Sequence, residues 1–443
     1  MRYVRRRLVL GLHLGILLGL AARGQTLDDR ARGLEFQKKA VEAYRRQDWP
    51  AFLENSRQAA ALAPGNARLT YNLAAAQARN GHSAEAARLV EGLLERRLDL
   101  GSDRDEDFAA VRDTDAFQGV RRKLAELRRP VGGSAVAFRL PEKDLLTEGI
   151  AFDPRSRAFF IGSVHRRKIL RRSADGVVSD FVREGQDGLQ SVLALRVDPK
   201  KRVLYACSAA LPQMAGYEKG MQGSSVLRFD LATGRLAARY PLPSDGKPHA
   251  ANDLAIAENG DLYVTDSLGS GVYRIRASAA SIETVVRPGV FRSPQGLAFG
   301  PNGRLYVADW GYGLFWVDGR GERHEVAAPD DVPLLGIDGL AVRGREIVVT
   351  QNGIEPHRVA ALELDSPGDR VVRGRILDMN DPEFAEPTLG VLVGDDFYFI
   401  GKSQWGLFDE KTGAFDPSRL QNPAVLKVSV APRRAGAARS VSR

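Results

Sequence analysis

The sequence has almost none of the residues used in thiol chemistry. Only one cysteine, Cys207, occurs in 443 residues, which excludes an intramolecular disulfide, a cysteine-rich zinc site and a thiol redox pair. Cys207 lies in the apolar run LYACS, a context typical of a buried, inert thiol. Beyond residue 24, no run is apolar enough to span a bilayer.

Charge is not distributed evenly along the chain. A formal charge of +9 and a pI near 9.6 would usually suggest a nucleic-acid or membrane-surface partner. Residues 1–24 hold five Arg and no acid, and residues 431–443 hold four Arg and no acid. Residues 25–430 are therefore balanced, and we expect no nucleic-acid binding.

The first 24 residues have the pattern of a secretory signal peptide. Arg5–Arg7 precede the 15-residue apolar stretch Leu8–Ala22, and small residues stand at Ala22 and Gly24. No cysteine follows the expected cut, so a lipid anchor is not indicated; a retained N-terminal anchor is the alternative. We expect a periplasmic or secreted protein, without a membrane span after cleavage, whose basic tail, residues 431–443, is disordered.

Residues 27–129 predict a helical domain with a 34-residue repeat. The matched positions of the two units are Ala40, Gln47 and Trp49 against Ala74, Gly81 and Ser83. With Ala86 and Pro64, the pattern resembles the tetratricopeptide family. The resemblance implies a protein or peptide partner on a concave face; a structural or dimerising helical cap is the alternative. A last helix, at about 115–128, would either cap the repeat or dock on the next domain.

Residues 135–430 predict a six-bladed β-propeller. Six copies of a strand–turn–strand unit begin at Thr147, Val192, Ala251, Pro294, Ile337 and Pro387. Their spacing of roughly 43–60 residues suits a four-stranded blade, and the 45 glycines suit many tight turns. AVAFRL from Ala135 would pair with VLKVSV from Val425 to close the ring. A β-sandwich would leave the six copies unexplained.

The residue before each innermost strand should face the central channel. These residues are Glu148, Leu193, Asn252, Gln295, Asp338 and Thr388. Four of them carry oxygens suited to a hard cation, and we expect these four to be its ligands: Glu148, Asn252, Gln295 and Asp338. None is His or Cys, which favours Ca²⁺ over zinc.

The pairs Glu148-Gly149, Asn252-Asp253 and Asp338-Gly339 resemble the SMP-30/gluconolactonase/LRE-like propellers. The resemblance covers roughly residues 136–430. It implies that Glu148, Asn252 and Asp338 bind a divalent ion. Gln295 stands where the family commonly has a second Asn, and its extra methylene would shift the ion or weaken the site.

Loops on the same face would shape a substrate pocket. The residues predicted for it are Asp253, Asp266, Asp309, Trp310, Asn352 and Trp405. The two indoles would pack a sugar-like or aromatic ligand, or would fill space between blades. The long loop Ser208–Ser225, with Met214, Tyr217 and Met221, would be a lid or an insertion without a role.

The resemblance to these propellers implies metal-assisted hydrolysis of a lactone or ester. Asp338 is the expected catalytic carboxylate, with Asp253 or Asp309 in reserve, and no histidine pair is placed for proton transfer. The rival hypothesis is a non-catalytic binding or assembly protein with a structural or vestigial metal site. It is favoured by the helical repeat and by Gln295.

Overall fold

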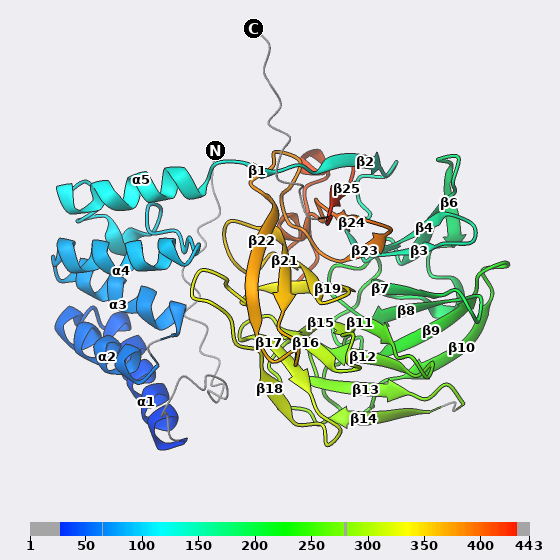
Figure 1. Ribbon diagram of the computed structural model, residues 1–443, viewed down its shortest axis with the longest axis horizontal. Helices are drawn as coiled ribbons and strands as arrows, with labels where there is room; N and C mark the ends of the chain where they lie inside the picture. Colours follow the sequence, from blue (N-terminus) through cyan, green and yellow to red (C-terminus); the bar gives the residue numbers. More distant parts are fainter. Residues whose placement is uncertain (1–26, 64, 279–280, 432–443) are drawn as a thin grey trace, which may run out of the picture. The chain divides into compact units, whose positions relative to one another are not determined.

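The computed structural model describes residues 27–63, 65–278 and 281–431, and the chain forms two compact units (Figure 1). The helical unit runs to Arg129 and includes the short segments Pro329–Pro333 and Ile354–Pro356. The second unit begins at Pro130. The predicted signal peptide lies outside the described residues, as does the predicted tail apart from Ala431.

The helical unit contains two helical hairpins and a final helix. Its helices are α1 (Leu27–Arg45), α2 (Trp49–Leu62), α3 (Ala67–Arg79), α4 (Ser83–Glu95) and α5 (Gln118–Leu127). The hairpin turns place Gln47 at φ 59° and Gly81 at φ 75°. Because these positions are 34 residues apart, the sequence repeat corresponds to a repeat of the turn. Whether the repeat belongs to the tetratricopeptide family stays a prediction.

The segment between α4 and α5 packs against α3. It carries the 3₁₀ turns η1 (Glu106–Phe108) and η2 (Asp115–Phe117), and Phe108 and Phe117 are buried. The Tyr71 hydroxyl on α3 donates to Asp105 at 2.8 Å. Lys123 on α5 forms ion pairs with Glu91 and Glu95 on α4, so α5 covers α4 within the unit, as the capping alternative predicts.

The second unit is the expected six-bladed propeller, drawn from cyan to red in Figure 1. Blade one contains β3 (Thr147–Asp153), β4 (Ala158–Ser163), β5 (Lys168–Arg172) and β6 (Val178–Val182). Blade two contains β7 (Ser191–Asp198), β8 (Val203–Ala209), β9 (Ser224–Asp230) and β10 (Leu236–Pro241). Blade three contains β11 (Ala251–Ile256), β12 (Leu262–Asp266), β13 (Gly271–Ile275) and β14 (Ile282–Val286).

The other three blades follow the same antiparallel order. Blade four contains β15 (Pro294–Phe299), β16 (Leu305–Asp309), β17 (Gly313–Val317) and β18 (Arg323–Glu325). Blade five contains β19 (Ile337–Arg343), β20 (Glu346–Gln351), β21 (Arg358–Leu364) and β22 (Val371–Met379), with β1 (Val131–Gly132) at its edge. Blade six contains β23 (Gly390–Val393), β24 (Asp396–Ile400), β25 (Ala424–Ser429) and β2 (Ala135–Arg139).

Blade six closes the ring with the two ends of the propeller sequence. β2 pairs antiparallel with β25, and Ala135 and Val136 face Lys427 and Leu426. The predicted pairing is confirmed. Because the first strand completes the last blade, the two ends of the propeller sequence are held together in one sheet.

Two glycines allow the innermost strands to approach one another closely. A Cβ on Gly149 would lie 2.7 Å from the Ala194 Cα of the next blade, and one on Gly296 would lie 2.5 Å from the Asp338 carbonyl oxygen. The obstructing atoms are backbone atoms, which cannot move aside cheaply. Gly149 and Gly296, which follow the channel residues Glu148 and Gln295, are thus needed for neighbouring inner strands to pack this closely.

Candidate active site in the propeller channel

The three residues expected to bind the ion are almost fully buried at the innermost strands. Glu148 on β3 and Asp338 on β19 are each 5% exposed, and Asn252 on β11 is 6% exposed. Polar side chains this deeply buried are stable only with compensating partners. Each of the three has one such partner.

Asn252 and Gln295 form a pair across blades three and four. The Asn252 Nδ2 group donates to Gln295 Oε1 at 2.7 Å, and Gln295 Nε2 donates to the Ser293 hydroxyl at 2.8 Å. The structure thus brings both predicted ligands together. Because Gln295 Oε1 accepts this hydrogen bond, Gln295 supports the Asn252 side chain.

A chain of two hydrogen bonds holds Asp338. Trp310 Nε1 donates to Asn352 Oδ1 at 2.9 Å, and Asn352 Nδ2 donates to Asp338 Oδ2 at 2.6 Å. Trp310 remains 42% exposed, so it does not fill space between blades. Three residues predicted for the site, Trp310, Asn352 and Asp338, are therefore linked by hydrogen bonds.

Glu148 takes its partner from blade six. Trp405 Nε1 donates to Glu148 Oε2. Trp405 lies in η4 (Trp405–Leu407), after β24, and is half-buried. Thr388 is also close, but its hydroxyl donates to the Glu148 backbone carbonyl at 2.9 Å. Of the remaining channel positions, Leu193 contributes only an apolar side chain.

The channel brings the buried carboxyl groups of Glu148 and Asp338 close enough for their charges to interact. Burial and then the charge of Asp338 raise the pKa of Glu148 well above its usual range. Burial also raises the pKa of Asp338 to about 7; the Asn352 hydrogen bond opposes this shift, and the charges of Asp253 and Glu386 add to it. A bound cation would relieve this repulsion.

Glu386 is the acid that sequence reasoning missed. Its charge acts on both Glu148 and Asp338, and its Oε2 accepts the Gly406 backbone N–H at 3.1 Å. It lies two residues before Thr388, outside the repeated position. The available signal was the sixth copy itself, which has no charged residue at its channel position.

Asp253 binds backbone and arginine groups. Its Oδ1 accepts the Leu254 N–H at 2.7 Å, its Oδ2 accepts the Leu297 N–H at 3.2 Å, and Arg196 lies 3.3 Å away. These contacts tie together the inner strands of blades two, three and four. Burial raises the pKa of Asp253, while Arg196 acts in the opposite direction.

Asp266 and Asp309 occupy equivalent positions at the ends of β12 and β16. Asp266 Oδ1 accepts the backbone N–H groups of Ala250 and Gly269, each at 2.8 Å. Asp309 Oδ2 accepts the Arg292 N–H at 2.8 Å. Both side chains are fully buried, and their contacts fix the loops that enter blades three and four. A pocket role for them stays a prediction.

His249 lies between two carboxylates on this face. Its Nδ1 contacts Asp266, and its Nε2 contacts Asp245 Oδ1 at 2.9 Å. Burial lowers the pKa of His249, but the two carboxylates outweigh it and raise the pKa overall. Both ring nitrogens are thus engaged.

The channel residues present oxygens suited to a divalent ion. Among the described residues, no hydrogen bond reaches Glu148 Oε1, Asn252 Oδ1 or Asp338 Oδ1. Two carboxylates and an amide fit a hard cation such as Ca²⁺. These three residues therefore fit the ion that the resemblance implies.

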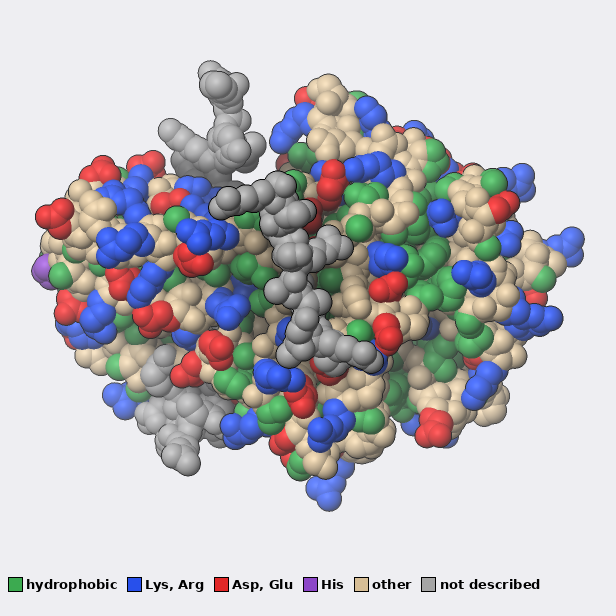
Figure 2. All heavy atoms as spheres, turned by 45° about the horizontal axis from the view of Figure 1, so that its top comes forward, with side chains coloured by type: hydrophobic (Ala, Val, Ile, Leu, Met, Phe, Trp, Pro, Cys, Tyr) green, Lys and Arg blue, Asp and Glu red, His purple; other side chains and the backbone are tan. Residues whose placement is uncertain are grey.

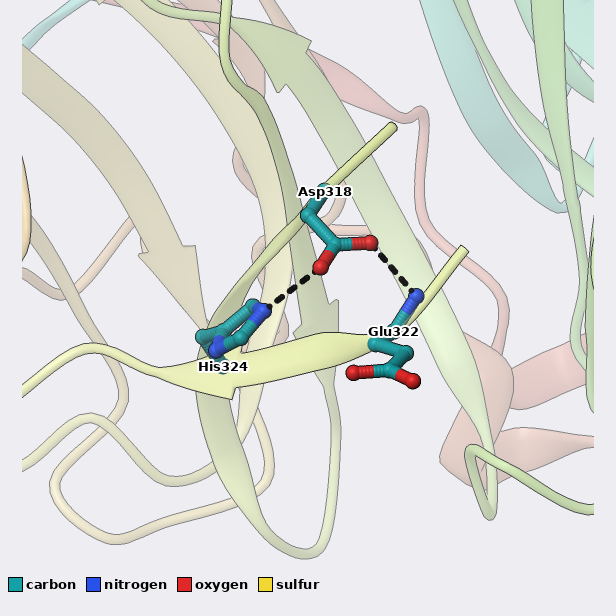
Figure 3. Close-up of side chains that lie close together, drawn as sticks. All are labelled: Asp318, Glu322 and His324. Carbon is teal, nitrogen blue, oxygen red and sulfur yellow. Dashed lines mark hydrogen bonds and ion pairs between the residues drawn. The ribbon is translucent and has the colours of Figure 1, made fainter. Parts of the chain in front are cut away.

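A second group of possible ligands lies on the outer hairpin of blade four. Asp318, Glu322 and His324 form the one group of three Asp, Glu, His or Cys, within the described ranges, whose ligand atoms all lie within 4.8 Å of one another (Figure 3). Asp318 contacts His324 Nε2 at 3.0 Å. This hydrogen bond, together with the backbone N–H groups of Glu322 and Arg320, lowers the pKa of Asp318 to about 2. Glu322 is exposed. Any metal titration must distinguish this group from the channel.

The protein surface carries both signs of charge. Figure 2 shows Lys and Arg interspersed with Asp and Glu over the face that it draws. No helix in the described part of the chain has the length and apolarity needed to cross a membrane.

The chain matches no family model and no curated protein. Its fold is similar to solved structures that include a gluconolactonase from Xanthomonas campestris, at 17% identity and a TM-score of 0.45 over 68% of this chain and 98% of that chain. Luciferin-regenerating enzyme has 13% identity and a TM-score of 0.47, over 68% and 95%. Virginiamycin B lyase from Staphylococcus aureus has 14% identity and a TM-score of 0.45, over 68% and 100%. Similarity of this degree concerns the fold alone, so the activity of this chain has to be argued from its own residues.

Proposed function

We propose that the propeller is a divalent-metal-dependent hydrolase acting on a small lactone or ester, with Ca²⁺ held in the channel. The observation that carries the proposal is that Glu148 Oε1, Asn252 Oδ1 and Asp338 Oδ1 receive no hydrogen bond from the described residues, while the other polar atom of each side chain has a partner. Export to the periplasm or the cell exterior belongs to the same proposal, on the pattern of residues 1–24.

The ion would polarise the substrate carbonyl and lower the cost of the developing negative charge. Asp338 would take the proton of the attacking water and return it to the leaving alkoxide. Asn352 fixes the orientation of the Asp338 carboxylate by donating to its Oδ2.

Calorimetric titration with Ca²⁺ tests the metal site, in parallel with hydrolysis of a panel of lactones and aryl esters. We expect Asp338→Ala to lose Ca²⁺ binding and hydrolysis. Asp318→Ala removes a ligand of the outer hairpin group and should leave both unchanged. Loss of Ca²⁺ binding in Asp318→Ala alone would place the ion on blade four and contradict the channel site.

A non-catalytic binding protein is the second candidate. It is favoured by the contact that occupies the Gln295 oxygen with Asn252, because one fewer oxygen is then available to hold an ion and polarise a substrate. Ca²⁺ binding that depends on Asp338, without turnover of any lactone or ester, would support this second candidate.

A further inference from the structure

The loop that follows β24 contacts two carboxylates, those of Glu148 and Glu386. The Trp405 indole N–H donates to Glu148, and the next residue, Gly406, donates its backbone N–H to Glu386 at 3.1 Å. Trp405 and Glu148 are 257 residues apart in sequence. Blade six therefore fixes a side chain that belongs to blade one.

Gln404 holds this loop in a defined conformation. It has φ 75° and is 6% exposed. Its Nε2 donates to the Lys143 carbonyl at 3.0 Å, and its Oε1 accepts the Gln421 N–H at 2.7 Å. A buried, left-handed residue with both amide atoms engaged leaves Trp405 little freedom to choose another direction.

The long blade-two loop docks on this blade-six loop. We call residues 210–223 and 403–422 together the cap. A Cβ on Gly413 would lie 2.0 Å from the Pro212 carbonyl oxygen, so the two loops are in direct contact. Met214 is 5% exposed, whereas Met221 is 39% exposed. The loop suggested as a lid is therefore anchored at its first half.

His165 joins the two halves of the cap. Its Nδ1 lies 2.6 Å from the Gln213 carbonyl oxygen, and its backbone carbonyl accepts the Ala215 N–H at 2.9 Å. Its ring packs against Phe408 at 5.4 Å and Phe415 at 5.0 Å between centroids. Because His165 touches neither Glu148 nor Trp405 by any of these contacts, it allows the cap to be loosened from a distance.

We propose that Trp405 is the positioning residue of Glu148, and that docking of the cap sets the affinity of the channel for its metal ion. The inference rests on the proposed channel metal site. Trp405 donates a hydrogen bond to Glu148 Oε2, so Glu148 Oε1 is the oxygen that remains for the ion. Partners that orient a metal ligand commonly change affinity by about 10–100-fold.

Calorimetric titration of the full chain with Ca²⁺ tests the proposal on Trp405→Phe, which keeps an aromatic ring and removes the N–H donor. We expect Ca²⁺ affinity to fall about tenfold or more. Trp49→Phe, in the helical unit, is the matched control and should bind as the wild type does. Equal affinity of Trp405→Phe and wild type would overturn the positioning role.

Indole ¹H–¹⁵N spectra give a readout that a purely structural role would not move. The chain has four tryptophans, and the resonance absent from Trp405→Phe identifies Trp405. Glu148→Gln removes the charged acceptor and should shift this resonance, leaving that of Trp49 in the helical unit in place. An unmoved Trp405 resonance would contradict the contact on which the proposal depends.

His165→Ala tests the coupling to the cap. We expect Ca²⁺ affinity to fall severalfold and the Trp405 resonance to broaden. Unchanged values of both would overturn the coupling while leaving the positioning role intact. If the wild type itself binds no Ca²⁺, the coupling and the proposed hydrolase both fail, while a Trp405 shift in Glu148→Gln would still show the positioning contact.

Discussion

Asn352 donates its side-chain amide to the Asp338 carboxylate at 2.6 Å. The hydrogen bond counters the rise in the pKa of Asp338 that burial causes. Replacing Asn352 with Leu should therefore raise this pKa further and weaken Ca²⁺ binding at pH 7 by about tenfold. Calorimetric titration at several pH values measures both effects. Asn259→Leu, in the turn between β11 and β12, is the control. An Asn352→Leu protein that binds normally at pH 7 would contradict the assignment.

Metal binding should depend on pH in a defined direction. Asp338 has a pKa raised to about 7, so it is largely protonated below that pH and must lose its proton to bind a cation. We expect Ca²⁺ affinity to increase as pH rises from 5.5 to 8. In the metal-free protein, Asp338 instead costs stability as pH rises from about 4 to 7, because the folded state retains a proton that the unfolded state releases.

Thermal unfolding at pH 5.5 and pH 8, with and without Ca²⁺, measures this linkage. The increase in Tm on adding Ca²⁺ should be larger at pH 8. Asp338→Asn removes one of the two buried ionisable ligands and should reduce the difference, while Glu148, whose pKa is also raised, keeps the remainder. A Ca²⁺ effect that is equal at both pH values in the wild type would be evidence against a protonated Asp338.

If Gln295 supports Asn252, replacing Gln295 should weaken Ca²⁺ binding. If its longer side chain instead weakens the site, shortening the side chain should strengthen binding. Because Gln295 orients Asn252 at 2.7 Å, Gln295→Leu should weaken Ca²⁺ binding severalfold without changing the fold. Circular dichroism provides the structural control. Tighter binding in Gln295→Asn would instead show that the longer side chain had weakened the site, and that a shorter amide can bind the ion itself.

Close approach of the inner strands predicts a stability effect at Gly296. Gly296→Ala places a Cβ 2.5 Å from the Asp338 carbonyl oxygen and should lower the free energy of unfolding by about 1–3 kcal/mol or more. Gly319→Ala, in the same blade, meets no atom within 4 Å and should be nearly neutral. Denaturant unfolding compares the two variants, and equal stabilities would contradict the close approach.

The repeated pattern was enough to predict the propeller and its closure. Turn residues at regular spacing and alternating apolar runs are local properties, so six strand–turn–strand units could be read directly, and the pairing of the strand at Ala135 with that at Val425 followed from the need to close the ring. Glu148, Asn252 and Asp338 were found because each occupies the same place in its repeat.

The partners of these residues could not be predicted in the same way. Trp405 and Glu148 meet across 257 positions, and Glu386 lies outside the repeated position. Asp253 fits the sequence pattern of the family, yet backbone N–H groups and Arg196 occupy its oxygens. Such contacts depend on how loops from different blades pack.

The sequence by itself determined the order of the strands, the number of blades and the residues that lie at the channel, since hydrophobic periodicity and glycine turns act over a few residues. Only the tertiary structure decided which polar atoms of the channel side chains form hydrogen bonds, and with which partners. Gln295 supports Asn252, Asn352 holds Asp338, and Trp405 holds Glu148. The physical reason is that a buried polar group must find a partner, and folding brings together partners that are far apart in the chain.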